Sequence, residues 1–122
     1  MKFQVYNPKE KNCDCVLRTF MKLLDKDYLK VKEDLENIAA SLGYESYQET
    51  EVFEKYFEKN GFIKIEEEDI LVNDLSFDNA NYGIFCYRED DYHLFPVIDR
   101  VAYDKNDRFW KMRVIALYRK DV

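Results

Sequence analysis

The spacing of apolar residues changes once along this chain of 122 residues, near Gly61, and this change limits the folds open to it. Before Gly61, apolar residues recur every three or four positions, as they do on one face of a helix. After Gly61, short segments rich in aromatic and β-branched residues are separated by acidic or Asn-containing segments, as strands are by turns. Helices that precede strands without alternating with them predict an α+β domain.

Three helices are expected in the first half. Asp14 is a suitable N-cap for a helix over residues 15–24. Gly43 suits the left-handed end of a second helix, whose apolar positions run from 31 to 42. Thr50 is the expected cap of a third helix, which ends at residues 60–61.

Five strands are expected in the second half, over residues 62–65, 82–87, 93–98, 101–104 and 112–118. We therefore expect one domain over residues 1–122, in which N-terminal helices pack on a C-terminal antiparallel sheet. The acidic runs 66–69 and 89–91 are expected to be solvated loops. The composition can supply one core, because 47% of the residues are apolar, 16% are aromatic and only three are Gly.

The charge of the chain disfavours a nucleic-acid partner. With 19 Lys and Arg against 25 Asp and Glu, the formal net charge is -6, and no basic run is present to neutralise phosphates. No membrane span is expected, because the longest apolar run, residues 114–118, is far shorter than the ~20 residues required. Because no apolar signal region is seen, the chain is expected to be cytoplasmic. Because the number of cysteines is odd as well, a disulfide framework is not expected.

Cys15 is the first candidate for chemistry, because it is expected at the first position of a helix. Unpaired backbone N–H groups and the positive end of the helix dipole favour a thiolate there, and the thiolate is the nucleophilic form. The same N–H groups can receive the oxyanion that forms when a carbonyl is attacked. Asp14 would oppose ionisation unless it turns toward the helix amides. The alternatives are that Cys15 is only a small buried residue, or that Cys13 competes as nucleophile without the dipole.

His93 is the only histidine, so any chemistry that needs an imidazole has a single source. If residues 99–100 form a two-residue turn, His93 and Asp104 point to the same side of a hairpin as diagonal neighbours. An acid behind an imidazole fixes its tautomer and stabilises its protonated form. Asn106 is the alternative orienting residue. Against this register, the second turn residue is not the preferred glycine, and Pro96 would interrupt the hydrogen-bond ladder.

The combination resembles the papain-like cysteine peptidase superfamily, in which a cysteine starts the first long helix and a His, then an Asn or Asp, follow from the sheet. The segment 14–18, Asp-Cys-Val-Leu-Arg, resembles the Asp-Cys-x-x-Arg start of small papain-like proteins of phages and bacteria. Residues 93–104 and the closing strand within 110–118 resemble later segments of the same proteins. The middle, about residues 44–82, matches only in general order. The chain departs from the pattern at three positions, Cys13, Thr19 and Tyr92.

The resemblance implies a cysteine peptidase, or a related thiol amidohydrolase or acyltransferase, in a bacterium or a phage-infected host cell. Cys15 would attack an amide of a peptide or protein substrate, His93 would relay the proton and Asp104 would orient His93. The backbone N–H of Cys15 would hold the oxyanion together with a side chain, for which Asn12 is the first candidate and Asn7 and Gln4 are the next. No cofactor and no metal are implied, and the oligomeric state is left open.

Two other classes of function are considered. The first is a catalytically inactive papain-like binding module, such as a phage-encoded acidic inhibitor of a host protein, which the acidic runs would suit. The second is a metal site built from Cys13, Cys15, Cys86 and His93. The metal site is disfavoured, because the Cys-x-Cys spacing is tighter than the usual two-residue spacing of zinc ligands.

Overall fold

The structure is a computed structural model that describes residues 1–9, 13–66 and 69–122 of the chain. These residues form three α-helices, six strands and two short 3-10 helices. In chain order the elements are β1 (Lys2–Val5), α1 (Cys15–Leu24), α2 (Tyr28–Leu42), α3 (Thr50–Lys59), β2 (Ile63–Glu66), η1 (Val72–Asp74), β3 (Asn81–Arg88), β4 (Asp91–Ile98), β5 (Val101–Asp104), η2 (Arg108–Lys111) and β6 (Arg113–Lys120). The predicted α+β class is therefore confirmed.

The sheet differs from the prediction in one strand. Its order is β1-β5-β4-β3-β6-β2, and β1 runs parallel to β5 while every other pair is antiparallel. The expected antiparallel C-terminal sheet is thus a mixed sheet that includes the N-terminus. Residues 2–5, Lys-Phe-Gln-Val, alternate polar and apolar side chains, but the segment is only four residues long and three of the four are exposed. Backbone pairing with β5 holds this strand in place.

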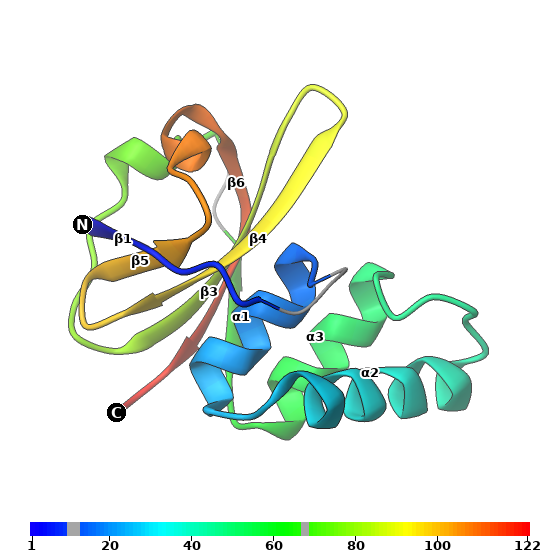
Figure 1. Ribbon diagram of the computed structural model, residues 1–122. Helices are drawn as coiled ribbons and strands as arrows, with labels where there is room; N and C mark the ends of the chain where they lie inside the picture. Colours follow the sequence, from blue (N-terminus) through cyan, green and yellow to red (C-terminus); the bar gives the residue numbers. More distant parts are fainter. Residues whose placement is uncertain (10–12, 67–68) are drawn as a thin grey trace.

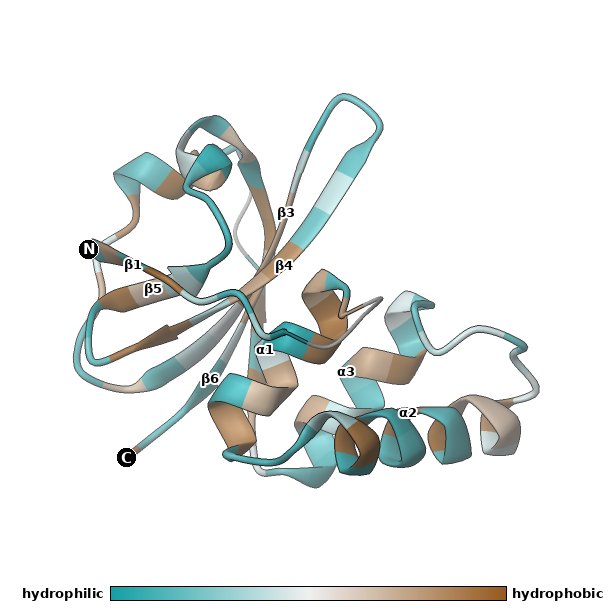
Figure 2. Cartoon of the chain, in the orientation of Figure 1, coloured by the Kyte–Doolittle hydropathy of each residue, from teal (hydrophilic) through white to brown (hydrophobic). Residues whose placement is uncertain are grey.

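The helices lie together on one side of the sheet (Figure 1). Their apolar stripes meet inward-facing side chains of β3, β4 and β6, including Phe85, Leu94 and Tyr118. A second apolar cluster covers the opposite face, where η2 supplies Phe109 against Phe95 of β4. The hairpin between β3 and β4 extends beyond both clusters and is hydrophilic at its tip (Figure 2). Residues 89–91 are exposed, as predicted, although Asp91 is already the first residue of β4. In the other acidic run, Glu66 is the last residue of β2, and residues 67–68 lie outside the described residues.

The helix ends follow the predicted capping residues with one exception. The Asp14 side chain accepts a hydrogen bond from the backbone N–H of Leu17, and Gly43 ends α2 in the left-handed conformation. Thr50 is the first helical residue of α3 rather than its cap. Among the described residues, no helix combines the length and apolar character needed to cross a membrane.

The hairpin between β4 and β5 has the predicted two-residue turn. Asp99 and Arg100 both have positive φ, 48° and 63°, and the strands pair Ile98 with Val101 and Val97 with Ala102. The pairing ends at Pro96, which has no N–H to donate. The first half of β4, which includes His93, therefore has β3 as its only strand partner in the described sheet, and α1 packs against β4.

Candidate active site

Cys15 is the first residue of α1, and its side chain is half-buried. Asp14, which precedes it, turns toward the helix: its Oδ1 accepts a hydrogen bond from the backbone N–H of Leu17 at 2.9 Å. The other oxygen, Oδ2, accepts hydrogen bonds from the hydroxyl of Tyr47 and from Nε2 of Gln48, the latter at 2.9 Å. The Asp14 carboxylate therefore accepts three hydrogen bonds and is turned toward the helix amides, as expected if Asp14 is not to oppose ionisation of the Cys15 thiol.

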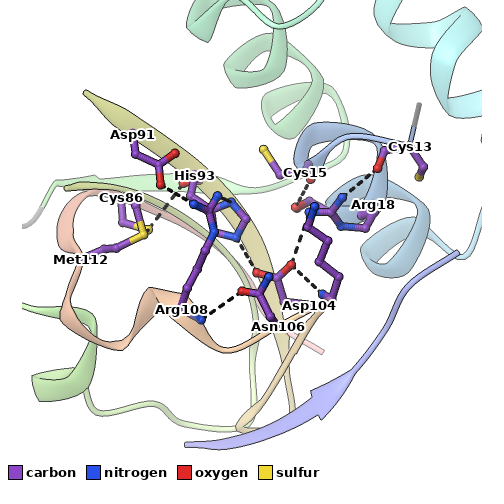
Figure 3. Close-up of polar contacts among 12 residues, drawn as sticks. Cys13, Cys15, Arg18, Cys86, Asp91, His93, Asp104, Asn106, Arg108 and Met112 are labelled. Atoms are coloured by element: carbon purple, nitrogen blue, oxygen red, sulfur yellow. Dashed lines mark hydrogen bonds and ion pairs between the residues drawn. The ribbon is translucent and has the colours of Figure 1, made fainter. Parts of the chain in front are cut away.

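His93 and Asp104 are in direct contact. His93 Nε2 lies 2.5 Å from Asp104 Oδ2, and the two side chains are buried between α1 and the β4–β5 hairpin (Figure 3). The predicted proximity of these two residues is confirmed. Asn106, the alternative orienting residue, instead accepts a hydrogen bond from the backbone N–H of Arg108 at 3.2 Å. The residue that holds the imidazole in this structure is therefore Asp104.

The structure also brings Cys15 to His93. Burial by itself would lower the pKa of His93, but hydrogen bonds to Asp104 and to the Cys15 side chain, together with their charges, raise it above the usual 6.5. Because Asp104 occupies Nε2, Nδ1 is the ring nitrogen left to face the thiol. The arrangement is a thiol at a helix N-terminus, next to an imidazole backed by a buried carboxylate. Such a group can transfer a proton between sulfur and nitrogen.

Arg18 was named from the sequence only as the last residue of the Asp-Cys-x-x-Arg segment, and its role was missed: in the structure it contacts Asp104. Its Nη2 lies 3.4 Å from Asp104 Oδ1, and its Nη1 donates to the backbone oxygen of Cys13 at 2.7 Å. The backbone N–H of Lys105 also donates to Asp104 Oδ1, at 2.8 Å. The buried Asp104 carboxylate is therefore paired and hydrogen-bonded on both oxygens. A signal for Arg18 was present, because it is a charged residue on the apolar face of the first helix.

Arg108 in η2 is the second residue that the sequence analysis missed. Its Nη1 forms an ion pair with Asp91 at the start of β4, and its Nη2 lies 3.5 Å from His93 Nδ1. Figure 3 shows the Arg108 side chain reaching the imidazole from the side opposite α1. Residues 105–112 contain no motif that would have predicted this contact.

The other two cysteines have different surroundings. The Cys13 sulfur lies 3.6 Å from the sulfur of Met21. Cys86 is fully buried, its sulfur contacts Met112 Sδ at 3.8 Å, and burial raises the pKa of its thiol far above the usual range. No disulfide joins the three cysteines. In the part of the chain that the structure describes, no group of three or more His, Cys, Asp or Glu side chains is placed to hold a metal ion.

The candidate oxyanion donors are only partly placed. Asn12, the first candidate, lies outside the described residues. Asn7 lines a cavity next to Cys15, whereas Gln4 is an exposed residue of β1 that lines neither of the cavities at Cys15. The side-chain oxyanion donor therefore stays a prediction.

Two cavities adjoin the Cys15–His93 pair. The first, called here the apolar cleft, has a volume of about 700 Å³ and is lined mainly by Val16, Phe53, Phe85, Leu94 and Ile115. The second, called here the polar cleft, has a volume of about 630 Å³ and includes Asn7, Asp14, Arg18, Tyr47, Lys105 and Arg108 in its lining. Cys15, His93, Gln48 and Tyr92 line both clefts. A substrate bound at Cys15 therefore has space on an apolar and on a polar side.

Comparison with known proteins returns no match: no family model fits the chain, and no curated protein or solved structure matches it. The geometry of the site and the sequence resemblance are therefore the two indications of function.

Proposed function

We propose that the chain is a thiol hydrolase of the papain-like kind, a cysteine peptidase or a related amidohydrolase or acyltransferase. The observation that carries the proposal is the set of contacts around His93. One ring nitrogen, Nε2, is bonded to buried Asp104. The other, Nδ1, lies 3.5 Å from Arg108 Nη2 and is the nitrogen that can serve the half-buried thiol of Cys15 at the start of α1. A thiol beside an imidazole that a third group orients is the arrangement typical of an activated cysteine nucleophile, and this supports the proposal.

The proposed reaction begins with transfer of the Cys15 proton to His93. The thiolate then attacks the carbonyl carbon of an amide and forms a C–S bond, while the new oxyanion accepts a hydrogen bond from the Cys15 backbone N–H. His93 gives the proton to the leaving nitrogen, the C–N bond breaks and a thioester remains. Attack by water, deprotonated by His93, would release an acid and restore the thiol. Attack by an amine in place of water would complete an acyl transfer.

We also propose that the α+β fold is a minimal papain-like fold. The support is the order of elements: the thiol starts the first long helix, and the imidazole and the carboxylate come from the sheet that follows. The segment from Asp14 to Arg18 adds to this support. Arg18 contacts Asp104, so the Asp-Cys-x-x-Arg spacing places a cap, a thiol and a buried cation around one site.

Alkylation tests the proposal directly. We expect iodoacetamide at neutral pH to modify Cys15 faster than Cys13, as followed by peptide mapping with mass spectrometry. In a peptide-library assay, Cys15→Ala should abolish cleavage, whereas Cys13→Ala, a matched loss of one thiol two residues away, should retain it. Resistance of Cys15 to iodoacetamide, or unchanged cleavage by Cys15→Ala, would contradict the proposal. A partner that is captured equally by wild type and Cys15→Ala, with no cleavage by either, would favour an inactive binding module instead.

A further inference from the structure

The polar cleft has a charge opposite to that of the whole chain. The chain has a formal net charge of -6, yet among the described residues those that line this cleft and carry a charge are three cations and one acid, Arg18, Lys105, Arg108 and Asp14. Arg18 is buried and paired with Asp104, and Asp14 is fully hydrogen-bonded. The cations left to face the cavity are therefore Lys105 and Arg108.

Lys105 and Arg108 are both able to receive an anion. Both are exposed, and within the described residues the Lys105 ammonium has no acidic partner. Arg108 uses one N–H for Asp91 and directs another toward His93, so three of its five N–H donors remain for a ligand. The apolar cleft contrasts with this arrangement, because the described residues of its lining include Glu49 and no Lys or Arg.

The position of Arg108 also indicates which part of a substrate would meet these cations. Its Nη2 lies 3.5 Å from His93 Nδ1, the nitrogen that the proposed reaction assigns to proton exchange with Cys15. In the proposed reaction this nitrogen gives its proton to the leaving amine. His93 lines both clefts, but Arg108 lines only the polar cleft, so we place the leaving-group side of the scissile bond next to Arg108 in that cleft.

We propose that the polar cleft binds a carboxylate of the substrate, on the leaving-group side of the scissile amide, through Lys105 and Arg108. The inference rests on the proposed function and adds the substrate class: peptides with an anionic group directly after the cleaved bond. A carboxylate can come from a free C-terminus or from an Asp or Glu side chain. Charge-assisted hydrogen bonds of this kind are expected to change kcat/KM by roughly tenfold.

A first test needs no catalysis. Iodoacetate carries a carboxylate and iodoacetamide does not, so the ratio of their alkylation rates at Cys15 reports anion binding beside the thiol. We expect the rate with iodoacetate divided by the rate with iodoacetamide to be about tenfold higher for Cys15 than for the thiol of free glutathione. The same ratio should fall several-fold in Lys105→Gln. Lys32→Gln removes the same charge from α2, which lines neither cleft, and should leave the ratio unchanged. A ratio equal to that of glutathione, or equal effects of the two variants, would overturn the inference.

A second test uses three peptides that differ only after the scissile bond. In the first peptide, the residue after the scissile bond is the last residue and has a free C-terminal carboxylate. In the second peptide that residue is Asp, in the third it is Asn, and in both the C-terminus is amidated. We expect the two anionic peptides to be cleaved about tenfold faster than the Asn peptide, and the faster of the two identifies the source of the carboxylate. Equal rates on all three would overturn the inference and leave the proposed function standing. If no peptide is cleaved, the proposed function is contradicted, and the alkylation ratio still decides whether a carboxylate binds.

Discussion

His93 Nε2 lies 2.5 Å from Asp104 Oδ2, and both side chains are only 2% exposed. In the neutral imidazole this contact places the proton on Nε2, where it donates to the carboxylate, and leaves the lone pair on Nδ1. Nδ1, which also lies 3.5 Å from Arg108 Nη2, is then the ring nitrogen that can accept the proton of Cys15. The contact with Asp104 therefore decides which end of the ring faces the thiol.

Asp104→Asn should weaken catalysis more than binding. The substitution removes the negative charge that orients the ring and stabilises the imidazolium, so we expect kcat/KM to fall about 10²–10⁴-fold with a small change in KM. The pKa of His93 should fall as well, because the hydrogen bond to Asp104 and its charge both raise it. Steady-state kinetics and NMR titration of the single histidine check the two effects. An unchanged titration of His93 would show that Asp104 does not tune the ring.

Arg18→Met should destabilise the fold. Arg18 is the buried guanidinium next to Asp104, and its loss leaves the buried carboxylate with His93 and the backbone N–H of Lys105 as its partners but without a permanent positive charge. Removing one member of a buried ion pair costs about 3–5 kcal/mol, so the free energy of unfolding in urea should fall by that amount. Arg113→Met is the control, because Arg113 is exposed at the start of β6 and should change stability by less than about 0.5 kcal/mol. Equal stability of the two variants would show that the pair contributes nothing.

Stability should depend on pH through His93. Its pKa in the folded protein is raised above the value of 6.5 that an unperturbed histidine has. The folded state therefore binds the proton more tightly than the unfolded state does, and the resulting stabilisation is complete below about pH 6.5 and is lost as the pH rises through the folded pKa. The difference in the free energy of unfolding between wild type and His93→Gln should shrink over this range. A difference that grows with pH would have the wrong sign for the proposed contacts.

The secondary structure was predictable because the period of the apolar residues is clear in most elements. The turn of the β4–β5 hairpin was the weakest part of that prediction, since Arg100 occupies a position that favours glycine. The structure provides compensating contacts: Arg100 Nε donates to the backbone oxygen of Phe77 at 3.0 Å, and the N–H of Lys2 donates to the oxygen of Arg100 at 2.9 Å. β1 supplies the second contact, which was hidden because β1 itself was not predicted.

The sequence predicted the thiol, the imidazole and the carboxylate of the site, but not the two arginines that contact them. Cys15, His93 and Asp104 each follow from a local feature, a helix start, a unique imidazole and a hairpin register. Arg18 and Arg108 depend on partners far along the chain, since Arg18 and Asp104 are 86 positions apart. Sequence spacing does not reveal contacts of this kind, although a charged residue on a buried helix face is a usable signal.

Gly83 of β3 should not tolerate a side chain. A Cβ at this position would lie 2.3 Å from Cζ of Phe57, whose ring packs against the strand from α3. Overpacking of a dense core costs about 1–3 kcal/mol, so Gly83→Ala should lower the free energy of unfolding by that amount. The double variant Gly83→Ala with Phe57→Leu has room for the methyl group and should be less destabilised than the sum of the two single changes. Simple additivity would argue against the close approach.

The proton shared by Cys15 and His93 can be observed directly, because His93 is the only histidine and gives one set of imidazole NMR signals. The measurement is a pH titration of these signals in wild type and in Cys15→Ala. The hydrogen bond and the charge of Cys15 both raise the pKa of His93, so its loss should move the titration of the ring to lower pH. Superimposable titration curves for the two proteins would show that the sulfur and the ring share no proton, and would contradict the account.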